Sequence, residues 1–143
     1  NSINLGYNLF TKYNNYDYIC LDEREWKLGL KTSSDVKLTD FIKNSKNKKK
    51  LKCSLTKGKR GSEYFLDNQK NESPVFVKKT VDTTGCGDAY FAITSLMIKG
   101  GLSSALIPFV GNIYAGIHGQ YFGNENITNK ITFLKYTKSI LNR

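Results

Sequence analysis

The chain has 143 residues, 39% of them hydrophobic and 13% aromatic, with twelve glycines and two prolines, which excludes a wholly disordered or low-complexity chain and indicates one globular domain. No apolar stretch approaches the roughly 20 residues that cross a bilayer, so no membrane span is predicted. The 22 basic and 12 acidic residues give a net charge of +10, which favours polyanions such as nucleic acid, anionic lipid or phosphorylated small molecules.

The numbers of arginines and cysteines narrow the choice of binding partners and of cellular location. Only three of the 22 basic residues are arginines, and base readout relies on arginine, so we expect no specific nucleic-acid partner. The three cysteines share no C-x-x-C spacing, which predicts neither a disulfide framework nor a zinc site and favours a cytoplasmic location. The chain begins with Asn1 and carries no signal peptide, so we expect it to be cut from a longer protein.

The N-terminal third is predicted to mix helices with one strand. Hydrophobic periodicity predicts a helix over 3–13, a strand over 16–21 and a helix over 35–46 that fades into the lysine-rich run 46–52. Asp22 stands three residues before Glu25, ahead of the apolar Trp26, which is the arrangement of a capping box. A further short helix is therefore predicted to start there, with Trp26 in the core.

The rest of the chain is predicted to hold three strands followed by three helices. The strands are expected at 51–55, 64–66 and 75–77, with a tight turn at 56–61 and a polar loop at 67–73; the helices are expected at 89–99, 103–120 and 131–141. Strands mixed with helices of this length indicate an α/β sheet covered by helices.

The glycine-bearing segment 82–88 lies between a predicted strand and a predicted helix. The first N–H groups of a helix have no partner within it, and the macrodipole adds about half a positive charge there. Gly85 and Gly87 let the backbone approach a phosphate closely. We therefore predict an anion site whose first helical turn is open to solvent.

Asp88 at this helix start allows two interpretations. It could simply stabilise the macrodipole, as acidic residues in a first turn do. A carboxylate beside a phosphate cradle repels the ligand, however, and is well placed to take a proton from an attacking hydroxyl, which favours a catalytic role. The Walker pattern is absent, and the dinucleotide fingerprint would need a glycine at Tyr90.

The segment from Asp82 to Phe91 resembles the D-T-x-G-A-G-D-x-F signature of the ribokinase-like (PfkB) carbohydrate kinases, with Cys86 in place of Ala. Weaker similarities keep the family's order: 22–25 resembles N-x-x-E, 56–61 resembles T-x-G-x-x-G, and 111–116 is similar to the helix that flanks the adenine. The resemblance implies that residues 1–143 form the C-terminal nucleotide-binding and catalytic part of a ribokinase-like α/β fold, without the N-terminal part that supplies most sugar contacts.

The resemblance implies ATP-dependent phosphoryl transfer to a hydroxyl of a sugar or sugar phosphate. Its catalytic residues would be Asp88 as general base and the backbone N–H groups of Gly85, Cys86 and Gly87 around the transferred phosphoryl. Its cofactor residues would be Glu25 for Mg²⁺, Asp82 and Thr84 for a monovalent cation such as K⁺, Thr56, Gly58 and Gly61 along the nucleotide, and Asn112 beside the base.

Two departures from the family pattern have simple explanations. Asp22 replaces Asn, either as a second negative charge near the metal or, as we favour, as the helix cap. Cys86 places a thiol at a helix start, where the pKa of a thiol tends to fall, but we expect it to pack as Ala would. His118, the only histidine, has no ligand partners at metal-binding spacing, so we do not expect it to bind metal.

The alternative hypothesis is a noncatalytic basic module that binds nucleotide or a polyanion, or that is fused to a nucleotidyltransferase. Residues 5–8 resemble, loosely, the opening of heptose-phosphate kinases. The acceptor sugar and the oligomeric state, including a homo-oligomer, remain open at the level of sequence.

Overall fold

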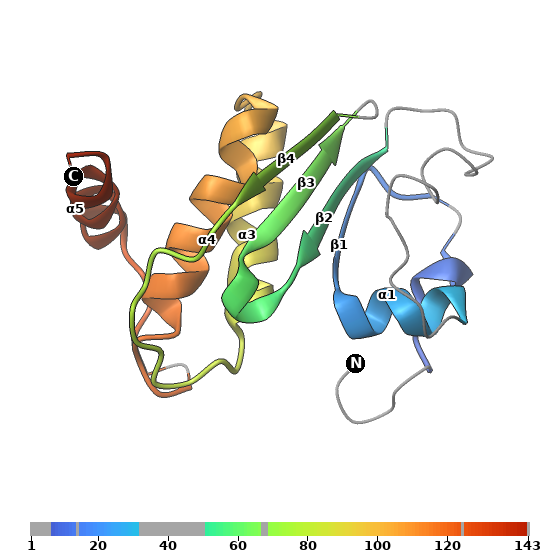
Figure 1. Ribbon diagram of the computed structural model, residues 1–143, viewed down its shortest axis with the longest axis horizontal. Helices are drawn as coiled ribbons and strands as arrows, with labels where there is room; N and C mark the ends of the chain where they lie inside the picture. Colours follow the sequence, from blue (N-terminus) through green and yellow to red (C-terminus); the bar gives the residue numbers. More distant parts are fainter. Residues whose placement is uncertain (1–6, 14, 32–50, 67–68, 124, 143) are drawn as a thin grey trace.

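A computed structural model describes residues 7–13, 15–31, 51–66, 69–123 and 125–142, and places them around one four-stranded sheet (Figure 1). The strands are β1 (Tyr18–Asp22), β2 (Lys52–Thr56), β3 (Ser62–Leu66) and β4 (Gln69–Ser73). The α-helices are α1 (Glu23–Leu30), α3 (Cys86–Lys99), α4 (Ile107–His118) and α5 (Lys130–Leu141), and the 3-10 helices are η1 (Phe10–Lys12), η2 (Gly58–Arg60) and η3 (Ser104–Leu106). The predicted α/β sheet covered by helices is confirmed.

The strand directions bring three strand ends to one edge of the sheet. β1 and β2 are parallel, with Asp22 opposite Thr56, whereas β3 is antiparallel to both of its neighbours, β2 and β4. Ser62 at the start of β3 therefore lies between Thr56 and Ser73, the last residues of β2 and β4. We call this edge, the lower one in Figure 1, the carboxyl edge.

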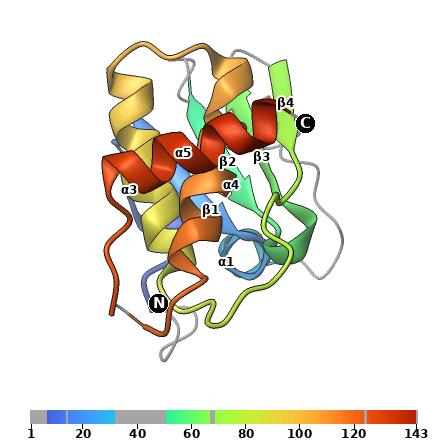
Figure 2. The ribbon, with the colours of Figure 1, turned by 90° about the vertical axis from the view of Figure 1, so that its left-hand side faces the viewer.

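Helices cover the sheet on both faces. On one face, the Trp26 ring of α1 stacks on Phe10 of η1 at 5.0 Å, and the pair closes a core. That core contains Phe10, Leu21, Trp26, Cys53, Leu55 and Phe65. Trp26 is 2% exposed, which confirms its predicted place in the core. The other face carries α3 and α4, and α5 lies outside α4 (Figure 2).

A network of hydroxyl groups fixes α3 on its face of the sheet. The Tyr18 hydroxyl of β1 is 2.8 Å from Ser54 Oγ of β2 and 2.8 Å from Thr94 Oγ1 of α3. Tyr90, one turn earlier on α3, donates to the same Ser54 Oγ at 3.5 Å. Because these groups are satisfied by one another, the polar face of two strands can be buried under the helix.

Two predicted elements are wrong in the middle of the chain. Residues 75–77 form no strand, and β4 lies instead within the segment expected to be a polar loop. Within the described residues β4 pairs with a strand on one side, β3, which suits its polar composition, and Lys70 forms ion pairs with Glu63 and Glu72. Val77 is buried against α4, where a Cβ on Gly116 would lie 2.5 Å from its Cγ2. The apolar residues after β4 thus pack on a helix.

The other predicted elements have different outcomes: the strands at 16–21, 51–55 and 64–66 and the helices at 89–99 and 131–141 are present with adjusted bounds, whereas the helix expected over 3–13 is wrong for the described residues and the helix expected over 35–46 is not tested. Of the helix expected over 3–13, the described part contains only η1, and residues 1–6 lie outside the described residues, as do the helix expected over 35–46 and most of the lysine-rich run. The helix expected over 103–120 divides into η3 and α4, with Pro108 in the first turn of α4. Within the described residues, no helix is long and apolar enough to span a bilayer.

Candidate functional site

The first turn of α3 carries backbone donors that point out of the helix end. Gly85 is the N-cap, in the left-handed region at φ 77°, and no side chain caps the helix. Cys86 N–H donates to Thr83 O at 3.2 Å. Among the described residues, the N–H groups of Gly85, Gly87 and Asp88 find no acceptor. Gly87 and Asp88 are exposed, so the predicted solvent-open first turn is present, with the Cys86 donor already engaged.

His118, at the last residue of α4, lies directly behind this turn. A Cβ built on Gly85 would lie 2.9 Å from His118 Nε2, an atom that is buried and has no hydrogen-bond partner among the described residues. Position 85 therefore requires glycine twice, once for its positive φ and once for the imidazole. Sequence reasoning did not foresee this neighbour, since only the packing of α4 on α3 brings it there. The described residues contain no group of three or more His, Cys, Asp or Glu able to hold a metal.

Asp82 ties the segment before α3 to the segment after α4. One carboxylate oxygen accepts from Thr84 N–H at 2.8 Å, and the other accepts from Gly123 N–H at 3.0 Å. These hydrogen bonds, with the Thr84 backbone as the largest cause, lower the pKa of Asp82. The carbonyl of Gly119 accepts from the Asp82 N–H at 3.2 Å, so the backbone of Asp82 is also bonded to the end of α4.

Cys86 packs as a small apolar residue. Its Sγ lies 3.8 Å from the Asp82 carbonyl oxygen and would be 2.9 Å from a Cβ on Gly119. Burial, together with the negative charge of Asp82, raises the pKa of the thiol. The pKa of Cys86 thus shifts opposite to the general tendency of thiols at helix starts, with burial as the largest cause. The expectation that Cys86 packs as Ala would fits this environment.

Asp22 and Glu25 form the capping box that the sequence predicts. Asp22 Oδ1 accepts from Glu25 N–H at 2.8 Å, and Glu25 Oε2 accepts from Asp22 N–H at 3.1 Å. The helix-cap interpretation of Asp22 is confirmed. The cap also holds the Glu25 carboxylate at the carboxyl edge, directly after β1.

Replacing Asp22 with alanine is expected to destabilise the protein by about 0.5–2 kcal/mol, because the first turn of α1 loses its side-chain acceptor. Urea unfolding of the purified chain measures this loss. Asp17, exposed in a bend and outside any helix, provides the matched control, and Asp17→Ala should change stability much less. Equal losses in the two variants would show that the cap contributes nothing.

Three carboxylates act electrostatically on the Cys20 thiol of β1. The pKa of the Cys20 thiol is raised to about 12, by burial first and then also by three nearby negative charges. These charges belong to Glu25, Asp88 and Asp22. The first turn of α3 and the first turn of α1 thus both lie within electrostatic reach of Cys20 in β1, although they are far apart in the sequence.

The turn at 56–61 lies at the same edge, beside α1. Thr56 Oγ1 donates to Leu21 O at 3.5 Å, across from β2 to β1. Arg60 forms an ion pair with Glu23 at the start of α1. Gly58 is exposed with φ 55°, whereas Gly61 is buried with φ 88°. The three residues expected along a nucleotide thus belong to one tight turn beside the start of α1.

Asn112 is buried in α4 and its amide is engaged by backbone. Nδ2 donates to Ser73 O at 2.7 Å and to Pro74 O at 3.1 Å. This contact fixes α4 to the end of β4, and the side chain is 7% exposed. Its expected place beside an adenine therefore stays a prediction, and its observed role is structural.

The fold of this chain is similar to solved structures of ribokinases and nucleoside kinases. The chain matches ribokinase from Thermotoga maritima with a TM-score of 0.72 at 21% identity, over 85% of this chain and 42% of that one. It also matches the structure of Arabidopsis thaliana ribokinase complexed with ribose and ATP. There the TM-score is 0.73 at 19% identity, over 85% of this chain and 41% of that one. It matches Methanocaldococcus jannaschii nucleoside kinase with a TM-score of 0.69 at 18% identity, over 86% of this chain and 40% of that one.

The chain therefore has a ribokinase-like fold, and it spans about 40% of the length of the solved structures that it matches. No family model matches the sequence, and no curated protein does. The match thus rests on the arrangement of the sheet and helices and shows the fold.

Proposed function

We propose that this chain carries the nucleotide site and the general base of an ATP-dependent kinase that phosphorylates a hydroxyl of a sugar or sugar phosphate. The observation that carries the proposal is the first turn of α3, where the exposed carboxylate of Asp88 shares a helix end with N–H groups that find no acceptor among the described residues. The ribokinase-like fold supports it, since the matched structures include a ribokinase with ribose and ATP and a nucleoside kinase with inosine. Ribose and inosine both carry a sugar hydroxyl, the group that we propose as the acceptor.

Each residue has a distinct role in this proposal. Asp88 is exposed at the site and accepts the proton of the attacking hydroxyl. The N–H groups of Gly85 and Gly87 donate to the negative charge that develops on the transferred phosphoryl. Cys86 N–H bonds to Thr83 O and would have to release that carbonyl before it could join them. The glycines keep Cβ atoms away from the phosphate.

Two cations fit the residues present. Glu25 offers a carboxylate at the carboxyl edge, held in place by the Asp22 N–H, and carboxylates with intervening water suit Mg²⁺. When bound, Mg²⁺ would neutralise charge on the ATP phosphates. Asp82, kept ionised by its hydrogen bonds, and the backbone at Thr84 offer the oxygen donors that suit K⁺. Asp82 itself holds the loop before α3 in position.

The isolated 143-residue chain is expected to bind ATP·Mg²⁺ weakly and to turn over at least about 10²-fold more slowly than the full product of its gene, because groups that position the nucleophile are missing. Calorimetry with ATP·Mg²⁺ and an assay for ADP release measure both quantities. Efficient sugar phosphorylation by the chain alone would contradict this expectation. A full gene product that binds polyanions but shows neither ATP binding nor turnover would support the noncatalytic module instead.

A further inference from the structure

Helix α5 buries one apolar face and leaves a second one exposed. The Phe133 ring packs edge-on against Tyr114 of α4, with ring centroids 5.8 Å apart, and the Tyr136 hydroxyl donates to Phe76 O at 3.3 Å. Three large apolar side chains of the same helix remain 66%, 44% and 68% exposed: Ile131, Leu134 and Leu141. Residues at intervals of three and seven share one face of a helix. These three side chains therefore form one stripe, on a different side of α5 from Phe133 and Tyr136.

The charges around this stripe have one sign. The helix carries three exposed lysines, Lys130, Lys135 and Lys138. Lys138 belongs to the stripe itself, because it lies three residues before Leu141. The sequence of α5 contains no acidic residue, and Glu125 is the one acidic residue of the chain after Asp88. The outer surface of α5 thus combines apolar side chains with positive charge.

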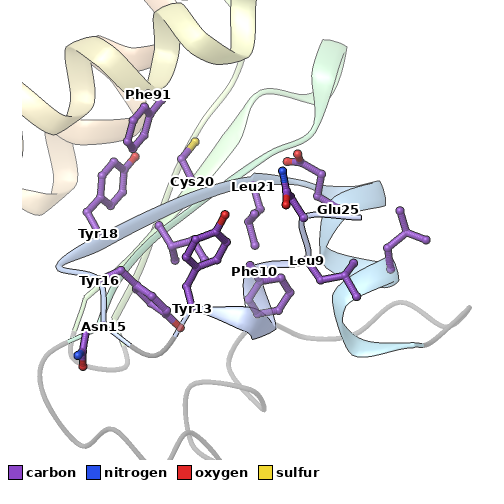
Figure 3. A pocket seen from close by; sticks show the side chains of 13 residues that line it. Leu9, Phe10, Tyr13, Asn15, Tyr16, Tyr18, Cys20, Leu21, Glu25 and Phe91 are labelled. Atoms are coloured by element: carbon purple, nitrogen blue, oxygen red, sulfur yellow. The ribbon is translucent and has the colours of Figure 1, made fainter. Parts of the chain in front are cut away.

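A second apolar surface, the groove of about 420 Å³ along β1, differs in both shape and charge (Figure 3). Aromatic side chains such as Tyr13 and Phe91 line it, and the charged residue in its lining is Glu25. Among the described residues, no lysine or arginine lines this groove. In contrast, α5 is a convex ridge that lies outside α4, in front of it in Figure 2. The combination of exposed apolar groups and lysines distinguishes α5 from the groove.

The shape and charge of this ridge favour a lipid surface over a protein. A stable protein interface takes about 20–30 residues from each side and centres on side chains that fill pockets, and a three-residue stripe on one convex helix falls well short of this. A second copy of α5 would place lysines against lysines, which repel. A bilayer surface admits a few apolar side chains to a shallow depth, and its anionic headgroups attract the lysines beside them.

We propose that α5 binds the surface of membranes that contain anionic lipid. The stripe Ile131, Leu134 and Leu141 enters the headgroup region, and the three lysines lie among the lipid phosphates. The net charge of +10 adds a longer-range attraction to the same surface. Such binding is peripheral and needs no spanning helix. The proposal concerns where the protein is located and does not depend on the reaction.

Sedimentation of the full gene product with lipid vesicles tests the proposal. Vesicles of phosphatidylcholine alone are compared with vesicles in which about 30% of the lipid is the anionic phosphatidylglycerol. Binding to the anionic vesicles should be at least about tenfold tighter, and it should weaken as salt is added, because salt screens the charges. Equal binding to the two kinds of vesicle, or binding to neither, would overturn the proposal.

A triple substitution tests the lysines of α5. Replacing Lys130, Lys135 and Lys138 with glutamine should weaken binding to the anionic vesicles by about 10²-fold, since each lysine near such a surface raises affinity about fivefold. The control replaces three exposed lysines outside α5 and removes the same charge: Lys12, Lys31 and Lys59. The control should weaken binding much less. Equal losses in the two triple variants would show that net charge alone drives binding, and the proposal would fail.

Single substitutions test the apolar stripe. Ile131→Gln and Leu141→Gln are compared with Leu96→Gln on α3, because the three native side chains are 66%, 68% and 67% exposed. All three variants should fold normally, since these side chains are largely exposed in the native protein. Each α5 variant should weaken vesicle binding at least about fivefold, as an apolar contact with the lipid is lost, and Leu96→Gln should leave it unchanged. Binding that needs the lysines but neither Ile131 nor Leu141 would indicate a general polyanion surface and overturn the proposal.

Discussion

Replacing Asp88 with asparagine in the full gene product is expected to lower kcat by about 10²- to 10⁴-fold, the usual contribution of a general base. Asparagine keeps the size and the hydrogen-bonding capacity of the side chain but cannot accept the proton of the attacking hydroxyl. Asp88 is exposed in the first turn of α3, so the substitution should leave the fold intact. Steady-state kinetics with saturating ATP measure the loss.

Two further measurements on the same variant separate catalysis from helix stabilisation. Affinity for ATP should hold or rise, because a negative charge near the terminal phosphate is removed. The loss of an acidic residue from the first turn should cost only about 0.3–1 kcal/mol of stability. An enzyme that is slightly destabilised but nearly as active as the native one would remove Asp88 from the mechanism and leave it a helix-stabilising residue.

Replacing Gly61 with alanine is expected to destabilise the protein by about 2–5 kcal/mol, from backbone strain and overpacking together. The added Cβ would lie 2.1 Å from Ser73 O and 2.9 Å from Pro74 Cα, at a φ of 88°. Both neighbours are backbone atoms held by the β3–β4 pairing and by Asn112, so neither can retreat easily. Urea unfolding of the 143-residue chain measures the cost.

Gly58 in the same turn is the matched control for Gly61. Its φ is also positive, at 55°, but a Cβ there would meet nothing within 4 Å. Gly58→Ala should therefore cost only the conformational penalty of about 1–2 kcal/mol. Equal losses for the two variants would show that the turn at 56–61 moves freely and is not fixed against the end of β4.

Elements with strong local signals could be predicted from the sequence. The capping box of Asp22 and Glu25 places the start of α1 correctly because its hydrogen bonds join residues three positions apart. The glycines at 85 and 87 and the apolar periodicity that follows likewise predict α3. β4 was missed because it is a polar strand stabilised by pairing with β3, and such pairing leaves no periodic apolar pattern in the strand itself.

The features of the site that depend on tertiary packing could not be predicted. The contact of His118 with Gly85 exists only because α4 packs on α3. The raised pKa of Cys86 depends on how deeply the sulfur is buried, which no spacing shows. Asn112 matched a motif by position, yet its amide bonds to the backbone after β4. In each case the surroundings of the residue come from contacts with residues distant in the sequence, which local sequence patterns do not show.

A screen of phosphoryl acceptors with the full gene product tests most directly whether Asp88 takes part in phosphoryl transfer from ATP to a sugar. ATP·Mg²⁺ is supplied with free sugars, sugar phosphates and nucleosides, and products are identified by mass. We expect that at least one sugar-containing acceptor gains a single phosphate on a hydroxyl, with ADP formed in equal amount, and that Asp88→Asn abolishes most of this product. ATP binding without transfer to any acceptor, or transfer that Asp88→Asn leaves unchanged, would contradict it.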